Sequence, residues 1–106
     1  MMTLREIQKE VDDWTRQFRP QYWPPLQIMA RLSEENGEVA REINHLYGIK
    51  KKKTDEKDNN LGQELVDMIF TISCMANSHR IRMQNEWNRM MQEKLYKRDN
   101  ERFRRK

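Results

Sequence analysis

The sequence predicts an all-α domain, built as an antiparallel four-helix bundle. Glycine and proline occur only three times each in 106 residues, so few positions interrupt a helix. Apolar side chains recur every three or four residues in four separate stretches, which is the period of an amphipathic helix. No stretch shows the strict alternation of apolar and polar residues that a half-buried strand would have. Helices joined by short links favour an antiparallel bundle.

The first helix is expected to begin after Thr3, the predicted N-cap, which has a capping-box partner in Glu6. Its apolar stripe comprises Leu4, Ile7, Val11, Trp14 and Phe18. Three prolines in RPQYWPP, residues 19–25, then end the helix. The helical phase of Trp14 predicts that its ring lies in the core.

The second helix is expected to begin near Pro25, because proline suits a first helical turn. Its predicted C-cap is Gly48. Gly37 lies inside this helix, at a cost of about 1 kcal/mol relative to alanine, which predicts that another helix or a ligand comes close there. Residues 49–60, IKKKKTDEKDNN, have no apolar period and are expected to form a loop.

The third helix is predicted from about Asn60 to Ser78 and is apolar on more than one side, so it should pack against more than one neighbour. The fourth is predicted from about Arg82 onward, with Trp87 in its packed stripe, and it fades into a charged tail at about residues 99–106. The length and the absence of an internal repeat predict a single domain, residues 1–106.

The charge balance is 21 basic against 17 acidic residues, or +4, and the basic excess gathers at Lys50–Lys53 and Arg102–Lys106. Such runs can meet phosphate or nucleic acid, although most are solvated. A single cysteine excludes an internal disulfide, and no apolar run approaches a membrane span of about 20 residues. The N-terminus has no signal-peptide core. These features predict a cytoplasmic protein that does not enter the membrane.

Two acidic pairs are the strongest candidates for a functional site. Glu35 and Glu38 lie three residues apart on the second predicted helix, and Glu64 and Asp67 have the same spacing on the third. Residues at i and i+3 share a helix face, so an antiparallel arrangement could bring the two pairs together as a four-carboxylate cage. The pair on the largely apolar third helix should be partly desolvated, which is costly unless positive charge neutralises it.

Two kinds of positive partner are open on this reasoning. Salt bridges are one, with Arg31 and Arg41 nearest in the sequence. Divalent cations are the other, and an oxygen-only set of ligands suits Mg²⁺, Mn²⁺ or Ca²⁺. A zinc site would use Cys or His, which do not cluster here. A di-iron carboxylate bundle would need a second Glu-x-x-His motif besides Glu42-Ile-Asn-His45.

These residues resemble a known signature. EENGE, residues 34–38, followed by ELVD, residues 64–67, resembles the E-E-x-x-E … E-x-x-D motif of the all-α nucleotide pyrophosphohydrolases, in particular the small MazG-like proteins. YWPPLQIMARLSEENGEVAREI, GQELVDMIFTISCMAN and EKLYKRDNERF extend the resemblance over most of the chain. It implies a MazG-like helical bundle that assembles as a homodimer or homotetramer.

The resemblance implies hydrolysis of a nucleoside triphosphate between the α- and β-phosphates, giving a nucleoside monophosphate and pyrophosphate. Mg²⁺ is the implied cofactor, with Mn²⁺ as a substitute, and house-cleaning of non-standard nucleotides is a theme of the family. The metal ligands carried over are Glu35, Glu38, Glu64 and Asp67. The candidates for taking a proton from the attacking water are Glu38 and Glu34.

Substrate contacts are expected outside the acidic motif. Lys94, Tyr96 and Arg98 lie in the segment where similar proteins carry phosphate-binding residues, and Trp23, held by prolines, could stack on a base. The alternative function is a non-enzymatic bundle that binds nucleic acid or a protein partner through its basic segments. Nucleic acid is the less favoured partner, because acidic clusters repel a polyanion when no metal is bound.

Overall fold

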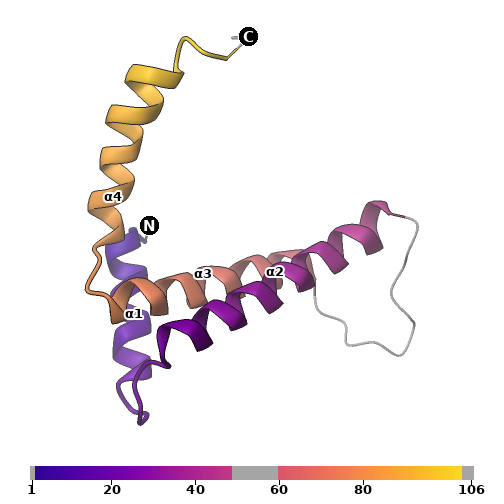
Figure 1. Ribbon diagram of the computed structural model, residues 1–106, viewed down its shortest axis with the longest axis vertical. Coiled ribbons are helices and arrows are strands. Elements are labelled where there is room, and N and C mark those ends of the chain that lie inside the picture. The colour runs from indigo at the N-terminus through magenta and orange to yellow at the C-terminus, as the bar shows by residue number, and fades with distance from the viewer. Residues whose placement is uncertain (1, 49–59, 104–106) are drawn as a thin grey trace.

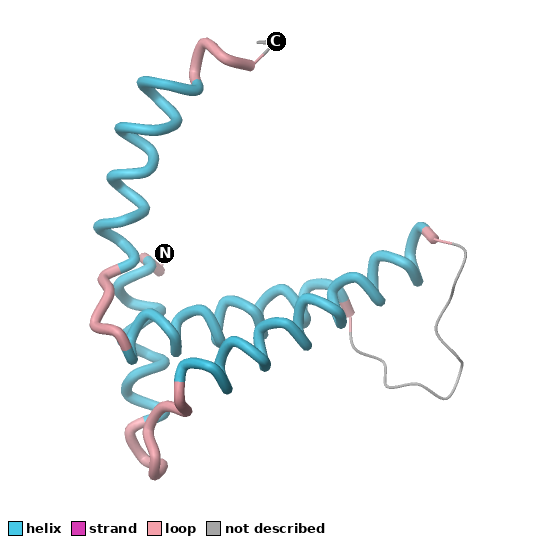
Figure 2. The backbone as a smooth tube through the Cα atoms, viewed as in Figure 1, coloured by secondary structure: helices cyan, strands magenta, loops and turns pink. Residues whose placement is uncertain are grey.

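The computed structural model describes residues 2–48 and 60–103, and all regular secondary structure in these ranges is helical (Figures 1 and 2). The elements are α1 (Leu4–Thr15), α2 (Pro25–Tyr47), α3 (Leu61–Ser78), α4 (Met83–Arg89) and the π-helix η1 (Met90–Asp99). The predicted all-α class is confirmed. Residues 49–59, most of the expected loop, lie outside the described residues. Within the described ranges, no helix is long and apolar enough to cross a membrane.

Local capping explains where the helices begin and end. The Thr3 hydroxyl accepts the Glu6 backbone N–H at 3.1 Å, and the Glu6 carboxylate accepts the Thr3 backbone N–H at 3.0 Å, so the capping box is present. The Asn60 side chain accepts a backbone N–H of the first turn of α3 at 2.8 Å. As predicted, α2 begins at Pro25 and has Gly48 as its C-cap.

The packed body consists of α1, α2 and α3. Figure 1 shows α2 and α3 side by side and antiparallel, with α1 crossing one end of the pair. The α4–η1 segment contacts α1 at its base and then points away from the pair. The radius of gyration is 17.2 Å, whereas a compact domain of this length would have about 13 Å. One chain therefore forms an open arrangement in which the fourth helical segment does not close over the other three.

The apolar core of one chain is small. Among the described residues, the buried apolar side chains are Val11, Ile28 and Ala76. Trp14 and Trp87, both expected in the core, are 54% and 51% exposed, so that expectation is wrong for a single chain. The physical reason is the open arrangement of the described residues. The Trp14 ring packs against Phe18 and Phe70 on part of its surface. Trp87 lies on α4, which points away from the α2–α3 pair (Figure 1).

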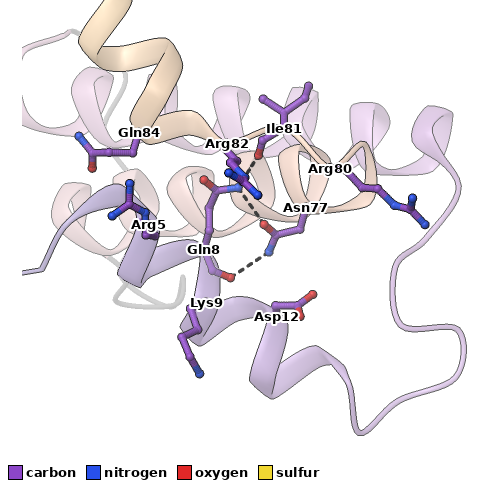
Figure 3. A pocket seen from close by; sticks show the side chains of 9 residues that line it. All are labelled: Arg5, Gln8, Lys9, Asp12, Asn77, Arg80, Ile81, Arg82 and Gln84. Carbon is purple, nitrogen blue, oxygen red and sulfur yellow. Dashed lines mark hydrogen bonds between the residues drawn. The ribbon is translucent and has the colours of Figure 1, made fainter.

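Amide side chains join α1 to the connection between α3 and α4 (Figure 3). The Gln8 side-chain amide donates to the Asn77 side chain and to the Ile81 carbonyl, both at 2.8 Å. Its oxygen accepts the Met83 backbone N–H at 2.9 Å. Gln8 therefore fixes the position where the chain turns from α3 into α4.

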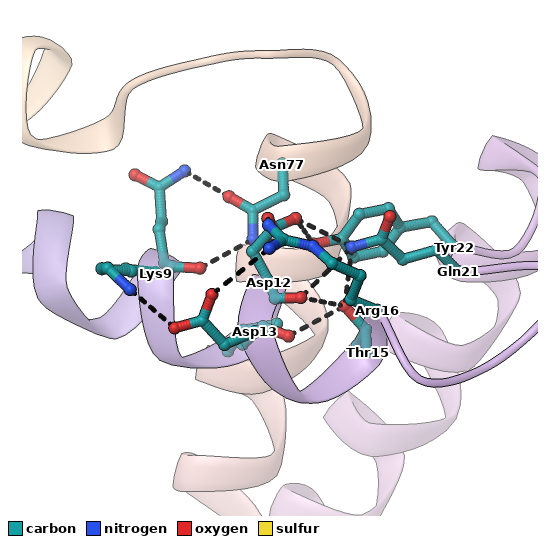
Figure 4. A network of polar contacts seen from close by, with 10 residues as sticks. Lys9, Asp12, Asp13, Thr15, Arg16, Gln21, Tyr22 and Asn77 are labelled. Atoms are coloured by element: carbon teal, nitrogen blue, oxygen red, sulfur yellow. Dashed lines mark hydrogen bonds and ion pairs between the residues drawn. The ribbon is translucent and has the colours of Figure 1, made fainter.

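A second polar network ties the segment between α1 and α2 to the helices (Figure 4). The Asp12 carboxylate accepts the Tyr22 hydroxyl at 2.6 Å and the Gln21 amide at 3.0 Å, and it pairs with Arg16. Asn77 donates to the Tyr22 oxygen at 3.1 Å. The hydrogen bond from Tyr22 lowers the pKa of Asp12, and burial followed by that same bond raises the pKa of Tyr22.

The Tyr22 network predicts a measurable loss of stability on removal of one oxygen. Tyr22→Phe should lower the free energy of unfolding by about 1–2 kcal/mol, because Asp12 and Asn77 each lose a partly buried partner. Urea denaturation followed by circular dichroism measures this change. Tyr47→Phe is the matched control, since Tyr47 is 80% exposed, and it should stay within about 0.5 kcal/mol. Equal stabilities of the two variants would contradict the assigned role of the network.

Candidate active site

Three carboxylates from two helices meet in the middle of the α2–α3 pair. Glu38 comes from α2, and Glu64 and Asp67 come from α3. One ligand atom from each lies within 4.8 Å of the others. The antiparallel packing of α2 on α3 places them together, because each residue lies on the face that its helix turns toward the other. Three of the four predicted ligands are thus brought into one cluster, two from α3 and one from α2.

Glu64 is the most deeply buried of the three, with 2% of its surface exposed. A hydrogen bond to Glu38 raises the pKa of Glu64, and burial raises it further. The charges of neighbouring acids, Glu42 among them, act in the same direction. The neighbouring acids therefore oppose ionisation of Glu64 when no cation is present.

Glu42, which the sequence placed only in a Glu-x-x-His motif, belongs to the same acidic group. It is 6% exposed, and its charge acts on Glu64. The signal was present in the sequence, because residues 35, 38 and 42 follow the spacing of one helix face. Glu42 lies outside both halves of the E-E-x-x-E … E-x-x-D motif, so the resemblance assigns it no role.

The neighbouring glutamates Glu34 and Glu35 lie in different environments, the first exposed and the second buried. Glu34 is exposed and pairs with Arg31 at 3.3 Å. Glu35 is 3% exposed, and its Oε2 lies 3.4 Å from the Arg31 side chain. Glu35 does not belong to the three-carboxylate cluster. The site therefore holds both an ion pair, between Arg31 and Glu35, and a cluster of three carboxylates, formed by Glu38, Glu64 and Asp67.

Two buried carboxylate oxygens lack a hydrogen-bond partner among the described residues, Oε1 of Glu35 and Oε2 of Glu64. A buried acceptor left in this way is costly, and most such groups in folded proteins have a partner. The available donor set is oxygen-only, which suits a hard divalent cation. The residues present therefore fit a cation site.

A cavity of about 490 Å³ opens beside the acidic cluster, and Asp67 and Glu35 line it. Its aromatic wall comprises Trp14, Phe18, Tyr22, Trp23 and Phe70. The Trp14 ring centroid lies 4.9 Å from that of Phe18 and 5.9 Å from that of Phe70, both in edge-to-face geometry. An apolar, ring-lined space next to carboxylates can hold a flat organic group while its charged part faces the acids.

Cys74 also lines this aromatic cavity. Burial, and secondarily the charge of Glu35, raises the pKa of the Cys74 thiol to about 11. The thiol is therefore protonated at neutral pH and is not a nucleophile there.

The predicted substrate-binding residues separate into two groups. Trp23 lines the aromatic cavity, as its position before α2 suggested. Lys94, Tyr96 and Arg98 lie exposed on η1 and do not line the aromatic cavity. The reason is the direction of η1, which follows α4 away from the α2–α3 pair (Figure 1). The predicted contribution of Lys50–Lys53 lies outside the described residues.

The close approach expected at Gly37 does not occur within the described part of the chain. A Cβ atom placed there would meet nothing within 4 Å. Gly37 faces open space, so no other described element explains its lack of a side chain.

Comparisons with known proteins agree with the all-α fold and identify the family. The family profile of the MazG nucleotide pyrophosphohydrolase domain matches residues 24–103. YpjD of Bacillus subtilis strain 168 is 45% identical over 104 residues, covering 98% of this chain and 93% of YpjD.

Two crystal structures are also similar. That of Bacillus subtilis YpjD, whose description as a pyrophosphatase is provisional, has a TM-score of 0.77 at 44% identity and covers 89% of this chain and 96% of that one. That of the Bacillus-conserved MazG protein, a nucleotide pyrophosphohydrolase, has a TM-score of 0.78 at 40% identity and covers 95% and 97%.

The buried carboxyl of Glu64 predicts a pH-dependent stability. Because its pKa is raised in the folded state, protonation contributes stability below the ordinary value of 4.5, and this contribution is lost as the pH rises through the folded-state pKa. In EDTA, Glu64→Gln should therefore raise the melting temperature near neutral pH by a few degrees, and the gain should vanish below pH 4.5.

Thermal unfolding by calorimetry at the two pH values measures this difference. Glu10→Gln is the matched control, because Glu10 is exposed on α1 and lines neither cavity, and its melting temperature should equal that of the wild type at both pH values. A lower melting temperature of Glu64→Gln near neutral pH would show that the acidic cluster is not a source of repulsion.

Proposed function

Because this chain belongs to the MazG nucleotide pyrophosphohydrolase family, we propose that it hydrolyses nucleoside triphosphates between the α- and β-phosphates. The products would be a nucleoside monophosphate and pyrophosphate. The observation that carries the proposal is the position of the cluster of Glu38, Glu64 and Asp67 at the edge of the aromatic cavity. One site thus offers an acidic part for cation-bound phosphates and a ring-lined part for the base. Non-standard nucleotides are a reasonable class of substrate to include in a screen.

We propose Mg²⁺ as the cofactor, with Mn²⁺ as a substitute. Glu38, Glu64 and Asp67 would hold it, and the partnerless Oε2 of Glu64 and the oxygen-only donor set support this assignment. When bound, Mg²⁺ would offset the charge of the phosphates and make a coordinated water easier to deprotonate. Glu35 stays a predicted ligand, and its partnerless Oε1 supports a contact on the side away from Arg31.

The remaining chemistry falls to side chains of this chain. Glu38 is half-buried at the cluster and is the better-supported general base, since it already shares a hydrogen bond with Glu64. Glu34 is exposed and paired with Arg31, so its predicted catalytic role gains less support. Trp23 and the neighbouring rings would stack on the base and exclude water from it.

We propose that the protein acts as a homodimer or homotetramer. The support is the outer face of α3, where apolar side chains stand in solvent in a single chain: Leu65, Val66, Ile69 and Ile72 are all 39–62% exposed. A contiguous apolar face of this kind marks an interaction surface. Lys94, Tyr96 and Arg98, which one chain holds away from its own site, keep a predicted substrate role only if an assembly brings them to one.

The other predictions stand as proposals of different strength. A single domain spanning residues 1–106 agrees with the family match over residues 24–103. A cytoplasmic location stays a prediction. Binding of nucleic acid or a protein partner through basic segments gains no support, because Lys50–Lys53 and residues 104–106 lie outside the described residues.

The catalytic assignment predicts a specific product and specific losses. Wild-type protein with Mg²⁺ should release pyrophosphate from nucleoside triphosphates. Glu38→Gln and Asp67→Asn should each lower kcat by about 10²-fold or more, as expected for loss of an acid–base or metal-ligating group. A coupled pyrophosphate assay over standard and modified triphosphates measures both, and omission of Mg²⁺ should abolish the signal.

Control variants separate the roles within this site. Glu10→Gln should leave turnover unchanged, and Trp23→Ala should raise KM with little change in kcat, because stacking acts before the chemical step. A large fall in kcat for Glu34→Gln would establish a catalytic role for that residue. Release of inorganic phosphate and a nucleoside diphosphate, in place of pyrophosphate, would refute the proposed bond cleavage.

The exposed face of α3 predicts a change of mass on substitution. Leu65→Glu combined with Ile69→Glu should convert the assembly to monomers and leave the helical circular dichroism spectrum unchanged, because both side chains are exposed within one chain. Light scattering after size exclusion measures the mass. Gln63→Glu adds a charge to an exposed position of the same helix and should not dissociate the assembly. A wild-type protein that is monomeric at all concentrations would refute the proposed oligomer.

A further inference from the structure

A second cavity, of about 600 Å³, lies at the corner where α1 meets the connection from α3 to α4 (Figure 3). We call it the basic corner cavity. Its cationic lining residues are Arg5 and Lys9 from α1, and Arg80 and Arg82 from the connection. All four are exposed, whereas the amide side chains between them, such as Gln8 and Asn77, are half-buried. The cavity therefore has a polar floor and a positively charged rim.

Three of these four cations have no anionic partner. Lys9 is paired with Asp13 at 2.7 Å. Among the described residues, no carboxylate forms an ion pair with Arg5, Arg80 or Arg82. Like charges gathered without a counter-charge repel one another, and each guanidinium offers five N–H donors. The rim is thus a place where an anion would gain charge-assisted hydrogen bonds without displacing an existing pair.

The one acid in the lining, Asp12, does not supply the missing counter-charge. Its carboxylate is occupied by the Tyr22 hydroxyl, the Gln21 amide and Arg16 (Figure 4). The hydrogen bond from Tyr22 also lowers the pKa of Asp12. Its charge is therefore directed into the network and away from the guanidinium groups of the rim.

The floor of the cavity is held rigidly by bonds that are already made. The Gln8 amide donates to Asn77 and Ile81, and the Asn77 amide donates to the Gln8 carbonyl at 3.0 Å and to Tyr22. These donors are occupied, so the rim carries the unused hydrogen-bonding capacity. A fixed floor reduces the entropy that a binding event would cost.

The backbone at Arg80 is an independent observation. Arg80 has φ of 56°, in the left-handed region, and the Ile81 N–H bonds to the Ala76 carbonyl at 2.9 Å, which closes a Schellman-type end to α3. Glycine is the residue that adopts this position without strain. This turn places Arg80 on the rim of the cationic cavity in a backbone conformation that arginine rarely adopts.

We propose that the basic corner cavity binds a small phosphate-bearing anion, at a site separate from the carboxylate cluster. Asp67 and Asn77 are ten residues apart on α3, so the two sites lie about 15 Å apart along that helix. The volume suits a ligand of nucleotide size, and a rim confined to one corner does not offer the extended groove that a nucleic acid strand follows. The inference rests on the lining and backbone of this cavity and does not depend on the proposed hydrolysis.

Calorimetric titration of the full chain in EDTA tests the proposal, because the carboxylate cluster repels an anion when no divalent cation is present. Inorganic pyrophosphate should bind saturably, one per chain, and should weaken as salt rises. The variant Arg5→Gln/Arg82→Gln should bind about tenfold more weakly or worse, since hydrogen bonds to charged groups are lost. Adenosine monophosphate titrated separately distinguishes a site for phosphate alone from one that also holds the nucleoside.

Three controls keep the outcome decisive. Arg89→Gln removes the same charge from α4 outside the cavity and should change the affinity by less than about twofold. Asp67→Asn should leave binding intact, which separates this site from the proposed catalytic one. Matching circular dichroism melts confirm that each variant folds. No saturable binding by the wild type, an unchanged affinity in the double arginine variant, or an oligonucleotide that binds and resists displacement by pyrophosphate would each overturn the proposal.

Discussion

Burial of carboxylates between α2 and α3 is the constraint on which the rest of this structure depends. Helix pairs usually bury apolar stripes and expose polar ones. Here Glu64 is 2% exposed and Val66, two residues later on the same helix, is 62% exposed. The pair therefore buries acids that repel one another and exposes groups that would gain from burial. Such an arrangement is unfavourable for an isolated, metal-free chain, since a buried charge without a partner costs several kcal/mol or is protonated.

The open shape of the single chain follows from the same inversion. Because the seam of α2 and α3 is occupied by polar groups, few apolar side chains are buried within the chain, and the apolar faces of α3 point outward. The α4–η1 segment adds no cover, since it extends away from the pair (Figure 1). Two unfavourable features remain, the repulsion between buried carboxylates and the exposure of apolar side chains. A cation between the carboxylates would offset the first, and a second copy of the chain against the apolar faces would offset the other. The proposed cofactor and the proposed oligomer would thus each stabilise a different consequence of the same helix packing.

Local signals in the sequence were sufficient to predict where the helices lie. They were not sufficient to predict how side chains far apart in the sequence pack together. The Thr3–Glu6 capping box, Pro25 and Gly48 act through neighbours in the chain, so pattern alone located these ends. Equal spacing of the acidic pairs on two helices was enough to predict that Glu38 lies near Glu64. The sequence named Arg31 as a possible salt-bridge partner, but spacing could not show that it would pair with Glu35 while Glu38 joined the cluster, since a side chain's partner depends on rotamer and burial. It also could not show that Trp14 and Trp87 are half-exposed, because helical phase gives a face and does not say what covers it.

The Tyr22 network shapes both cavities at once. Tyr22 lines the aromatic cavity and Asp12 lines the basic corner cavity, so their hydrogen bond crosses the wall between the two. Holding the Asp12 carboxylate against Tyr22 turns its charge away from three guanidinium groups that form no ion pair within the described residues. The same bond fixes the tyrosine ring beside the rings that would hold a base. Under the two proposals, the separated acidic and basic groups would accept phosphate by opposite means: the carboxylates would need a bridging cation, and the arginines would bind the anion directly.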